Sequence, residues 1–193
     1  AGLECTFCSA LTGSQSLVTD DRKVRAQTRS FLLKGIEVAA ELGSHVFMGP
    51  FLAPVGYLPG RRRTEDEWKR GVEGLQSLIP ALSAHDVAIA MEPLNRFETY
   101  MLNTASDAAR LCDEVGNPHV GVLLDTFHAN IEEKTLAAAA ATLGPHIKHV
   151  HTCENDRGIP GSGHVDWNAL FPALERAGYD GWLVIESFGF AIQ

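Results

Sequence analysis

Six short runs with a strand-like composition recur along the chain, and longer amphipathic segments separate them. In the longer segments the apolar positions repeat with helical spacing, which predicts helices between the strands. The expected strands lie in LECTFCSAL, SHVFMGPFL, VAIAMEPLN, HVGVLLDTF, IKHVHTCEN and GWLVIESFG. The expected helices cover residues around 20–42, 65–85, 104–115, 132–143 and 166–177.

Several helix ends carry their own signals. Thr64 with Glu67 predicts a capping box at the start of the second helix, Asp166 is suited to the N-cap of the last, and Gly178 to its end. Strands that alternate with helices at this spacing predict βαβ units, a parallel sheet and right-handed crossovers. No segment has the composition of a linker, so a single domain over residues 1–193 is expected.

The third predicted strand has two different faces. Ala88, Ala90 and Glu92 share one face, and bulkier apolar residues share the other. Small and polar groups on one face and bulky groups towards helices suit a closed α/β barrel. The interior of such a barrel converges on a site at the carboxyl ends of its strands.

Four successive predicted strands end on a residue that can bind a metal ion. These residues are Glu92, Asp125, His151 and Glu186, and they lie roughly 30 residues apart, about the length of one βα unit. Because the carboxyl ends of parallel strands meet at one edge, the four side chains are expected to lie close together. One acidic residue at a strand end can simply mark where the chain enters water, but four ligands in succession favour a site. His128 is expected on the loop that follows Asp125.

The types of these four residues indicate the metal. Three carboxylates and one imidazole resemble neither a structural zinc site nor an all-oxygen calcium site. They suit Mn²⁺, Co²⁺ or Mg²⁺ with positions left open for a substrate, which indicates catalysis. His149 lies on the same strand face as His151 but one pleat deeper, and it is expected to pack below the site.

Composition and charge exclude several classes of function. The 193 residues include 45% hydrophobic residues, enough for a substantial core, and the formal net charge of -8 argues against a binder of nucleic acid or anionic membranes. No apolar run approaches the roughly 18 residues that cross a bilayer, and no leader opens the chain, so a cytoplasmic protein is expected. The four cysteines are too few and scattered for a disulfide framework, and Cys5 and Cys8 are expected to be buried thiols.

Four segments together resemble a known enzyme family. MEPLNRFETYMLNT, LLDTFHANIEE, HVHTCENDRGIPGSGHVDW and VIESF are similar to the ketose 3-epimerases, the D-tagatose and D-psicose 3-epimerase group of the xylose-isomerase-like TIM-barrel superfamily. The resemblance runs through most of the chain, and the order and spacing of the motifs make it specific. It implies a (β/α)₈ barrel and a metal-dependent isomerase that acts on a sugar.

The resemblance also implies roles for single residues. One divalent metal ion, usually manganese or cobalt, would be bound by Glu92, Asp125, His151 and Glu186. Glu92 and Glu186 would form the acid/base pair. The substrate would be contacted by Glu98, His128 and Arg157, although Arg157 by itself would be read as a surface loop residue.

The chemistry of epimerisation agrees with these roles. Inverting a carbon beside a carbonyl requires one base on each face of the substrate, and in an eight-stranded barrel Glu92 and Glu186 would lie on nearly opposite walls. A metal ion would lower the cost of a cis-enediolate intermediate. The sequence PGSG at 160–163 is interpreted as a turn rather than a phosphate cradle, so the expected reaction is C3 epimerisation of a free ketose.

Two alternatives stay open at this point, and a third is disfavoured. A hydroxypyruvate isomerase or an inosose dehydratase of the same superfamily would share the enolate chemistry. An endonuclease IV-like phosphodiesterase would need more histidine ligands and a basic groove, which a chain of charge -8 does not provide. The chain could also be a sugar-binding fragment without activity.

The length of the chain sets a further expectation. A (β/α)₈ barrel takes about 250 residues, so about six βα units are expected here, without the first βα unit and without the last strand and helix. Such an arc would have two unpaired edges. A homo-oligomer, a dimer or tetramer, is therefore expected to cover them.

Overall fold

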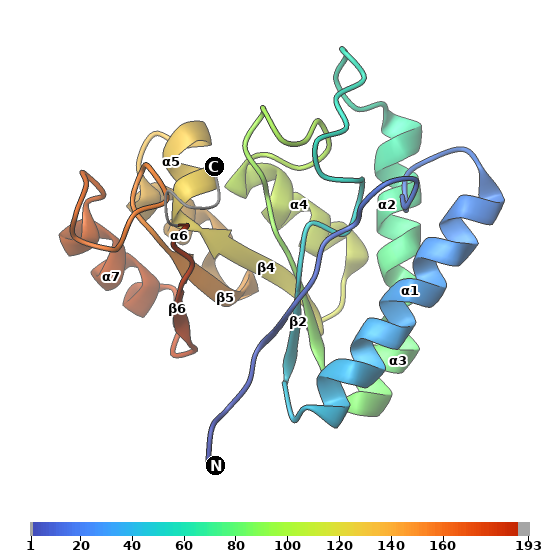
Figure 1. Ribbon diagram of the computed structural model, residues 1–193, viewed down its shortest axis with the longest axis horizontal. Coiled ribbons are helices and arrows are strands. Elements are labelled where there is room, and N and C mark those ends of the chain that lie inside the picture. Colours follow the sequence, from blue (N-terminus) through green and yellow to red (C-terminus); the bar gives the residue numbers. More distant parts are fainter. Residues whose placement is uncertain (1, 189–193) are drawn as a thin grey trace.

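A parallel sheet of six strands forms the centre of the protein, which is described by a computed structural model of residues 2–188 (Figure 1). The strands lie side by side in chain order, and every neighbouring pair is parallel. They are β1 (Phe7–Cys8), β2 (Val46–Gly49), β3 (Ala88–Met91), β4 (Val120–Asp125), β5 (Ile147–Thr152) and β6 (Leu183–Ile185). All six predicted strands are therefore confirmed.

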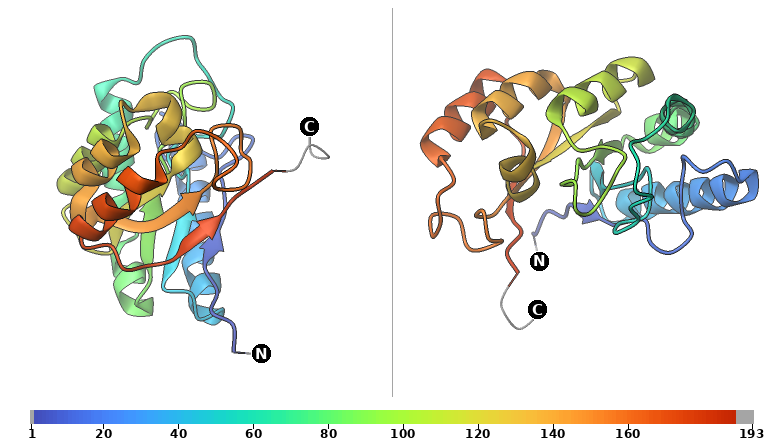
Figure 2. Two further views of the ribbon diagram at one scale, coloured as in Figure 1. Left: turned by 90° about the vertical axis from the view of Figure 1, so that its left-hand side faces the viewer. Right: turned by 90° about the horizontal axis from the view of Figure 1, so that it is seen from above.

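The helices cover one face of this sheet, and the other face is open (Figure 2). The sheet curves around its open face, so the strands form half of a barrel with the helices outside. The helices are α1 (Arg22–Glu41), α2 (Glu65–Gln76), α3 (Ile79–His85), α4 (Ala105–Val115), α5 (Thr126–Glu132), α6 (Leu136–Leu143), the 3₁₀ turn η1 (Gly144–His146) and α7 (Trp167–Arg176). None of the helices in residues 2–188 is long and apolar enough to cross a membrane.

Side-chain caps explain where most helices begin. The predicted capping box is present, because Thr64 accepts the Glu67 N–H and the Glu67 carboxylate accepts the Thr64 N–H. Asp166 caps α7 as predicted. The long helix expected over residues 65–85 is divided into α2 and α3, and Pro80 lies in the first turn of α3, where its missing N–H has no cost.

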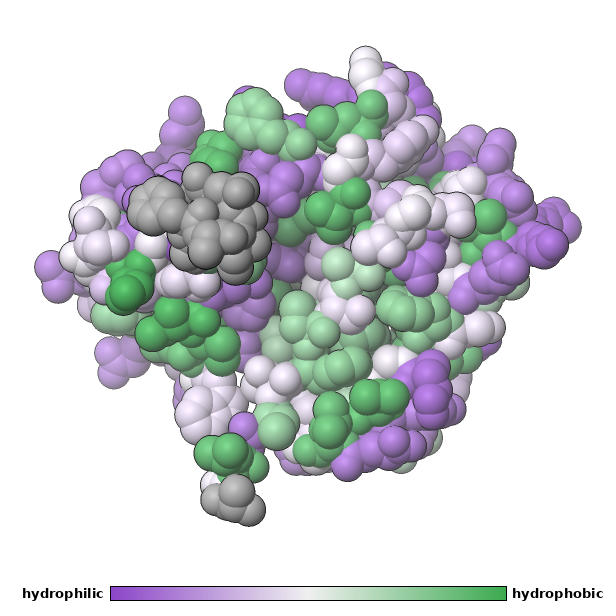
Figure 3. Space-filling model, in the orientation of Figure 1, coloured by the Kyte–Doolittle hydropathy of each residue, from purple (hydrophilic) through white to green (hydrophobic). Residues whose placement is uncertain are grey.

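The two faces of the sheet differ as the strand pattern predicts. Ile89 and Met91 belong to the large core between the sheet and the helices. Ala90 points to the other face, where it forms a separate small cluster with Val46, Met48 and Leu123. Apolar residues occupy the centre of the open face and hydrophilic ones surround it (Figure 3). The interior of the arc therefore has a small apolar floor below the strand ends.

Two expectations from the sequence are wrong. His128 lies in helix α5 rather than on a loop, because the Asp125 side chain accepts the N–H groups of Phe127 and His128 and starts a helix directly at the end of β4. Cys5 and Cys8 are exposed rather than buried. Within the described residues β1 is an edge strand of the sheet, which agrees with the exposure of these two thiols.

Candidate metal centre and substrate-binding site

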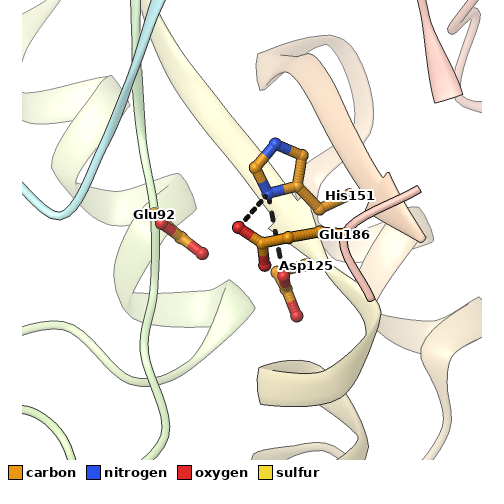
Figure 4. Close-up of side chains that lie close together, drawn as sticks. All are labelled: Glu92, Asp125, His151 and Glu186. Atoms are coloured by element: carbon orange, nitrogen blue, oxygen red, sulfur yellow. Dashed lines mark ion pairs between the residues drawn. The ribbon is translucent and has the colours of Figure 1, made fainter. Parts of the chain in front are cut away.

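Four side chains converge at the carboxyl ends of β3 to β6. Glu92 follows β3, Asp125 ends β4, His151 lies near the end of β5, and Glu186 follows β6. One possible ligand atom from each residue lies within 4.8 Å of the others. Figure 4 shows that Glu92 approaches from the opposite side to the other three. The structure therefore brings together the four residues that the sequence selects.

His151 provides a test of whether these residues fit a metal ion. Its Nδ1 atom is buried and has no hydrogen-bond partner among the described residues. This atom faces Glu186 Oε1 at 3.4 Å and Asp125 Oδ2 at 3.8 Å, beyond a good hydrogen bond to either (Figure 4). A buried polar atom without a partner is costly, and a cation between these groups would satisfy it. Three carboxylates around one imidazole thus fit a divalent ion.

The carboxylates are in an electrostatically unusual environment. Burial, followed by the negative charges of Asp125 and Glu186, raises the pKa of Glu92 well above its usual value. Burial also raises the pKa of Asp125. Burial acts in the same sense on Glu186, but His151, Asp125 and the positive charge of Arg157 outweigh it and lower the pKa of Glu186. Glu92 and Glu186 therefore differ in their tendency to hold a proton.

The two oxygens of Asp125 have different partners. Oδ1 accepts the N–H groups of Phe127 at 2.8 Å and His128 at 3.1 Å and so caps α5. Oδ2 points into the cluster, towards His151 and Arg157. The cap fixes the rotation of the carboxylate, so one oxygen is presented to the site.

Arg157 reaches this cluster from the loop after β5. Its Nη1 donates to Asp125 Oδ2 at 3.0 Å and also to Glu186 Oε2, and its Nη2 lies 2.8 Å from His128 Nε2. Its guanidinium carbon lies 4.4 Å from the ring centre of Phe127 and 5.0 Å from that of Phe188. Arg157 is therefore part of the site and not a surface loop residue.

His128 is held in position by Asn95, which the sequence patterns did not single out. The backbone N–H of Asn95 donates to His128 Nδ1 at 3.1 Å, and Asn95 Nδ2 lies 2.8 Å from the same atom. Asn95 Nδ2 also donates to Glu98 Oε1 at 2.8 Å. Burial and the charge of Arg157 lower the pKa of His128 to about 3, so the imidazole is neutral. The three residues expected to contact substrate thus lie around one edge of the cluster.

A second residue outside the predicted set, Glu154, organises the loop that carries Arg157. Glu154 is fully buried and accepts hydrogen bonds from the backbone N–H of Gly161 at 2.6 Å, that of Val165 at 3.0 Å and Trp167 Nε1 at 2.7 Å. The sequence around Glu154 did not predict this role, because Glu154 stands at the start of a loop with several other charged residues. A glutamate followed by glycines is a weak signal unless the fold of the loop is known.

His149 lies below His151 as expected. The two rings are perpendicular, with centres 5.2 Å apart, and His149 is buried. It does not belong to the group of four converging ligands.

Several known proteins are similar to this chain in sequence or in structure. A protein from Synechocystis sp. named "Probable ketose 3-epimerase" is 40% identical over 189 residues, which are 98% of this chain and 66% of that protein. A D-psicose 3-epimerase from Ruminiclostridium cellulolyticum is 32% identical, over 97% of this chain and 64% of that protein. A solved structure of an L-ribulose 3-epimerase superposes with a TM-score of 0.93 at 31% identity, over 98% of this chain and 64% of that one.

The chain thus spans about two-thirds of the length of these relatives. The resemblance to ketose 3-epimerases drawn from the four motifs is confirmed. Residues 1–191 match the family described as "Xylose isomerase-like TIM barrel". This match, the half-barrel of parallel strands and the superposition lead to one conclusion: the chain belongs to the xylose isomerase-like TIM barrel family.

Proposed function

We propose that this chain acts in the C3 epimerisation of a free ketose. The observation that carries the proposal is the placement of Glu92 and Glu186 on opposite sides of one ligand cluster (Figure 4). Their strands, β3 and β6, are separated by β4 and β5. A sugar bound over the cluster would therefore have one carboxylate near each face, as an inversion requires.

The same four residues would hold one divalent ion. Three carboxylates with one imidazole favour Mn²⁺ or Co²⁺. Mg²⁺, a hard cation that prefers oxygen ligands alone, is the alternative. When bound, this ion would polarise the C2 carbonyl and the C3 hydroxyl of the sugar and so make the C3 proton easier to remove.

The two glutamates would divide the proton transfers. Glu186, whose pKa is lowered, accepts the C3 proton. The electron pair of the broken C–H bond forms the C2=C3 double bond, and the π pair of the C2 carbonyl moves onto its oxygen to give the enediolate. Glu92, whose pKa is raised, returns a proton to C3 on the other face. In the reverse direction the roles exchange. His128, Arg157 and Glu98 would orient the hydroxyl groups of the sugar.

The loop after β5 supports an unphosphorylated substrate. Its glycine-rich part could bind a phosphate only through free backbone N–H groups. The N–H groups of Gly161 and Val165 donate to Glu154, and that of Ser162 donates to the carbonyl of Ile159. These donors are already used, which supports a free sugar as the substrate.

Product analysis tests the proposal. The chain loaded with Mn²⁺ is incubated with a C3-deuterated ketose in ordinary water, and the products are separated and examined by NMR. The expected product is the C3 epimer with the label lost to solvent, because different carboxylates remove and return the proton. A dehydrated product would favour the inosose dehydratase alternative, and a product in which ketone and aldehyde have been exchanged would favour the hydroxypyruvate isomerase alternative. Sugar binding without turnover would favour a binding fragment.

We also propose that the protein is a cytoplasmic homo-oligomer, a dimer or tetramer. Several large apolar residues are exposed, among them Trp182 and Ile185 beside the β6 edge. Apolar surface of this kind is commonly covered in an assembly. Light scattering is expected to give a mass of at least two chains, and a stable monomer would contradict this proposal.

A further inference from the structure

The strongest feature outside the proposed proton transfers is the place of Arg157 among the metal ligands. Its guanidinium contacts two of the four candidate ligands, Asp125 and Glu186, and only 15% of its side chain is exposed. A substrate-binding arginine needs only to reach the sugar. Arg157 instead forms ion pairs with the carboxylates that would bind the cation.

One oxygen atom is shared between the two positive charges. Because Asp125 Oδ1 caps α5, Oδ2 is the oxygen that Asp125 can offer to an ion. The same Oδ2 accepts the hydrogen bond from Arg157 Nη1 at 3.0 Å and lies 3.8 Å from His151 Nδ1. A divalent ion bound by Asp125 and His151 would therefore lie beside the guanidinium. Like charges this close repel strongly where little water screens them.

The carboxylates, rather than His128, hold the guanidinium in this place. Nδ1 of His128 accepts the backbone N–H of Asn95, so the ring proton lies on Nε2, where Arg157 Nη2 approaches to 2.8 Å. Two N–H donors then face each other, so the contact with His128 does not stabilise the guanidinium of Arg157 in its observed position.

The backbone conformation also directs the side chain of Arg157 into the site. Its φ of 65° lies in the left-handed region, which is costly for a residue with a Cβ atom. The turn is fixed by the hydrogen bond from Arg157 N–H to the Glu154 carbonyl and by that from Phe188 N–H to the Arg157 carbonyl. The surrounding structure thus maintains a strained residue whose side chain points at the ligand carboxylates.

We propose that Arg157 is an internal counter-cation of the metal centre. It holds the carboxylates of Asp125 and Glu186 together and competes with the divalent ion for them. Arg157 therefore lowers the affinity for the metal and keeps the ligands in place while the metal exchanges. This inference rests on the proposed metal site and concerns its affinity, not the sugar chemistry.

Metal titration of three Arg157 variants and one control variant tests the inference. Arg157→Met and Arg157→Gln remove the charge, and Met keeps an apolar stem between Phe127 and Phe188. Arg157→Lys keeps the charge. Lys34→Met removes the same charge from the exposed surface of α1, where Lys34 pairs with Glu37, and serves as the control for net charge. Chelator-treated proteins are titrated with Mn²⁺ by calorimetry, and their melting temperatures are measured with and without Mn²⁺.

The uncharged variants are expected to bind Mn²⁺ about tenfold more tightly or better, since a neighbouring positive charge is gone. Without metal they should melt at a lower temperature than the wild type, and Mn²⁺ should raise their melting temperature by more. Arg157→Lys and Lys34→Met should bind Mn²⁺ nearly as the wild type does. Damage to the site would weaken binding, so a gain in affinity identifies the counter-cation role.

The outcomes distinguish failure of the metal site from failure of the counter-cation role. A folded wild-type chain that binds no Mn²⁺ would overturn the metal site itself. A wild type that binds Mn²⁺, with uncharged variants that bind equally or more weakly, would overturn the counter-cation role alone. If Arg157→Met does not fold, Arg157→Gln and Arg157→Lys still supply the comparison of charge with no charge.

Discussion

The fully buried carboxylate of Glu154 should contribute a large share of the stability of the loop that carries Arg157. Glu154→Gln keeps the size of the side chain but replaces one acceptor oxygen by an NH₂ donor. Oε1 accepts the Gly161 N–H and the Trp167 indole N–H, and Oε2 accepts the Val165 N–H. Whichever way the amide is turned, at least one of these donors then faces another donor.

The size of the effect follows from these contacts. A buried donor left without an acceptor costs about 1–3 kcal/mol, and hydrogen bonds to a charged group are stronger than those to a neutral amide. Loss of about 3 kcal/mol in the free energy of unfolding is therefore expected for Glu154→Gln. In a domain of this size that loss corresponds to a decrease in melting temperature of roughly 6–12 °C.

Glu114 provides a matched control. Its carboxylate also accepts an indole N–H, from Trp68 at 2.7 Å, but 39% of its side chain is exposed on α4. Water can replace the lost acceptor there, so Glu114→Gln should cost less than about 1 kcal/mol. Urea unfolding followed by circular dichroism measures both variants. Equal destabilisation by the two substitutions would refute the reasoning, because burial would then have no effect.

Three further predictions concern the metal, the two bases and acid stability. Asp125→Asn should lose bound manganese and epimerisation together, and full manganese occupancy by elemental analysis would show that the ligand set is wrong. Glu92→Gln and Glu186→Gln should each lower the rate of epimerisation by about 10² or more, while each variant retains exchange of the C3 label in one epimer. If Glu186→Gln with metal bound epimerised as fast as the wild type, the two-base mechanism would be wrong. The hydrogen bonds from Arg61 lower the pKa of Glu67 to about 2, below its usual 4.5. The stability that Glu67 adds is therefore present above about pH 4.5 and lost as the pH falls towards 2, so the urea midpoints of wild type and Glu67→Gln should converge in acid; a constant gap would contradict the lowered pKa.

The main features of the fold could be predicted from the sequence because each one depends on local pattern. Apolar runs with period-two faces identify the six strands, and the recurrence of one ligand at each strand end predicts where Glu92, Asp125, His151 and Glu186 meet. These inferences need only the geometry of parallel strands. They do not depend on how any loop folds.

The remaining parts of the site depend on neighbours that are distant in sequence. Helix α5 was missed because its first residues continue the strand without a break, and only the cap by Asp125 marks its start. Asn95 supports His128 across 33 positions of sequence. Arg157 and Glu154 acquire their contacts from the folded loop after β5, and loop conformation is not encoded in a periodic pattern.

The attachment of β6 sets how long the ligand cluster persists. Among the described residues, this three-residue strand pairs with β5 alone, and Leu183 and Ile185 are 43% and 62% exposed. Short strands with few buried contacts open locally at much lower free energy than the global unfolding of a domain. Opening of β6 would withdraw Glu186 and leave the other three ligands in place on β3, β4 and β5. The amide protons of β6 should therefore exchange with solvent before those of β4, and the lifetime of the four-ligand arrangement is that of this one strand and not that of the whole fold.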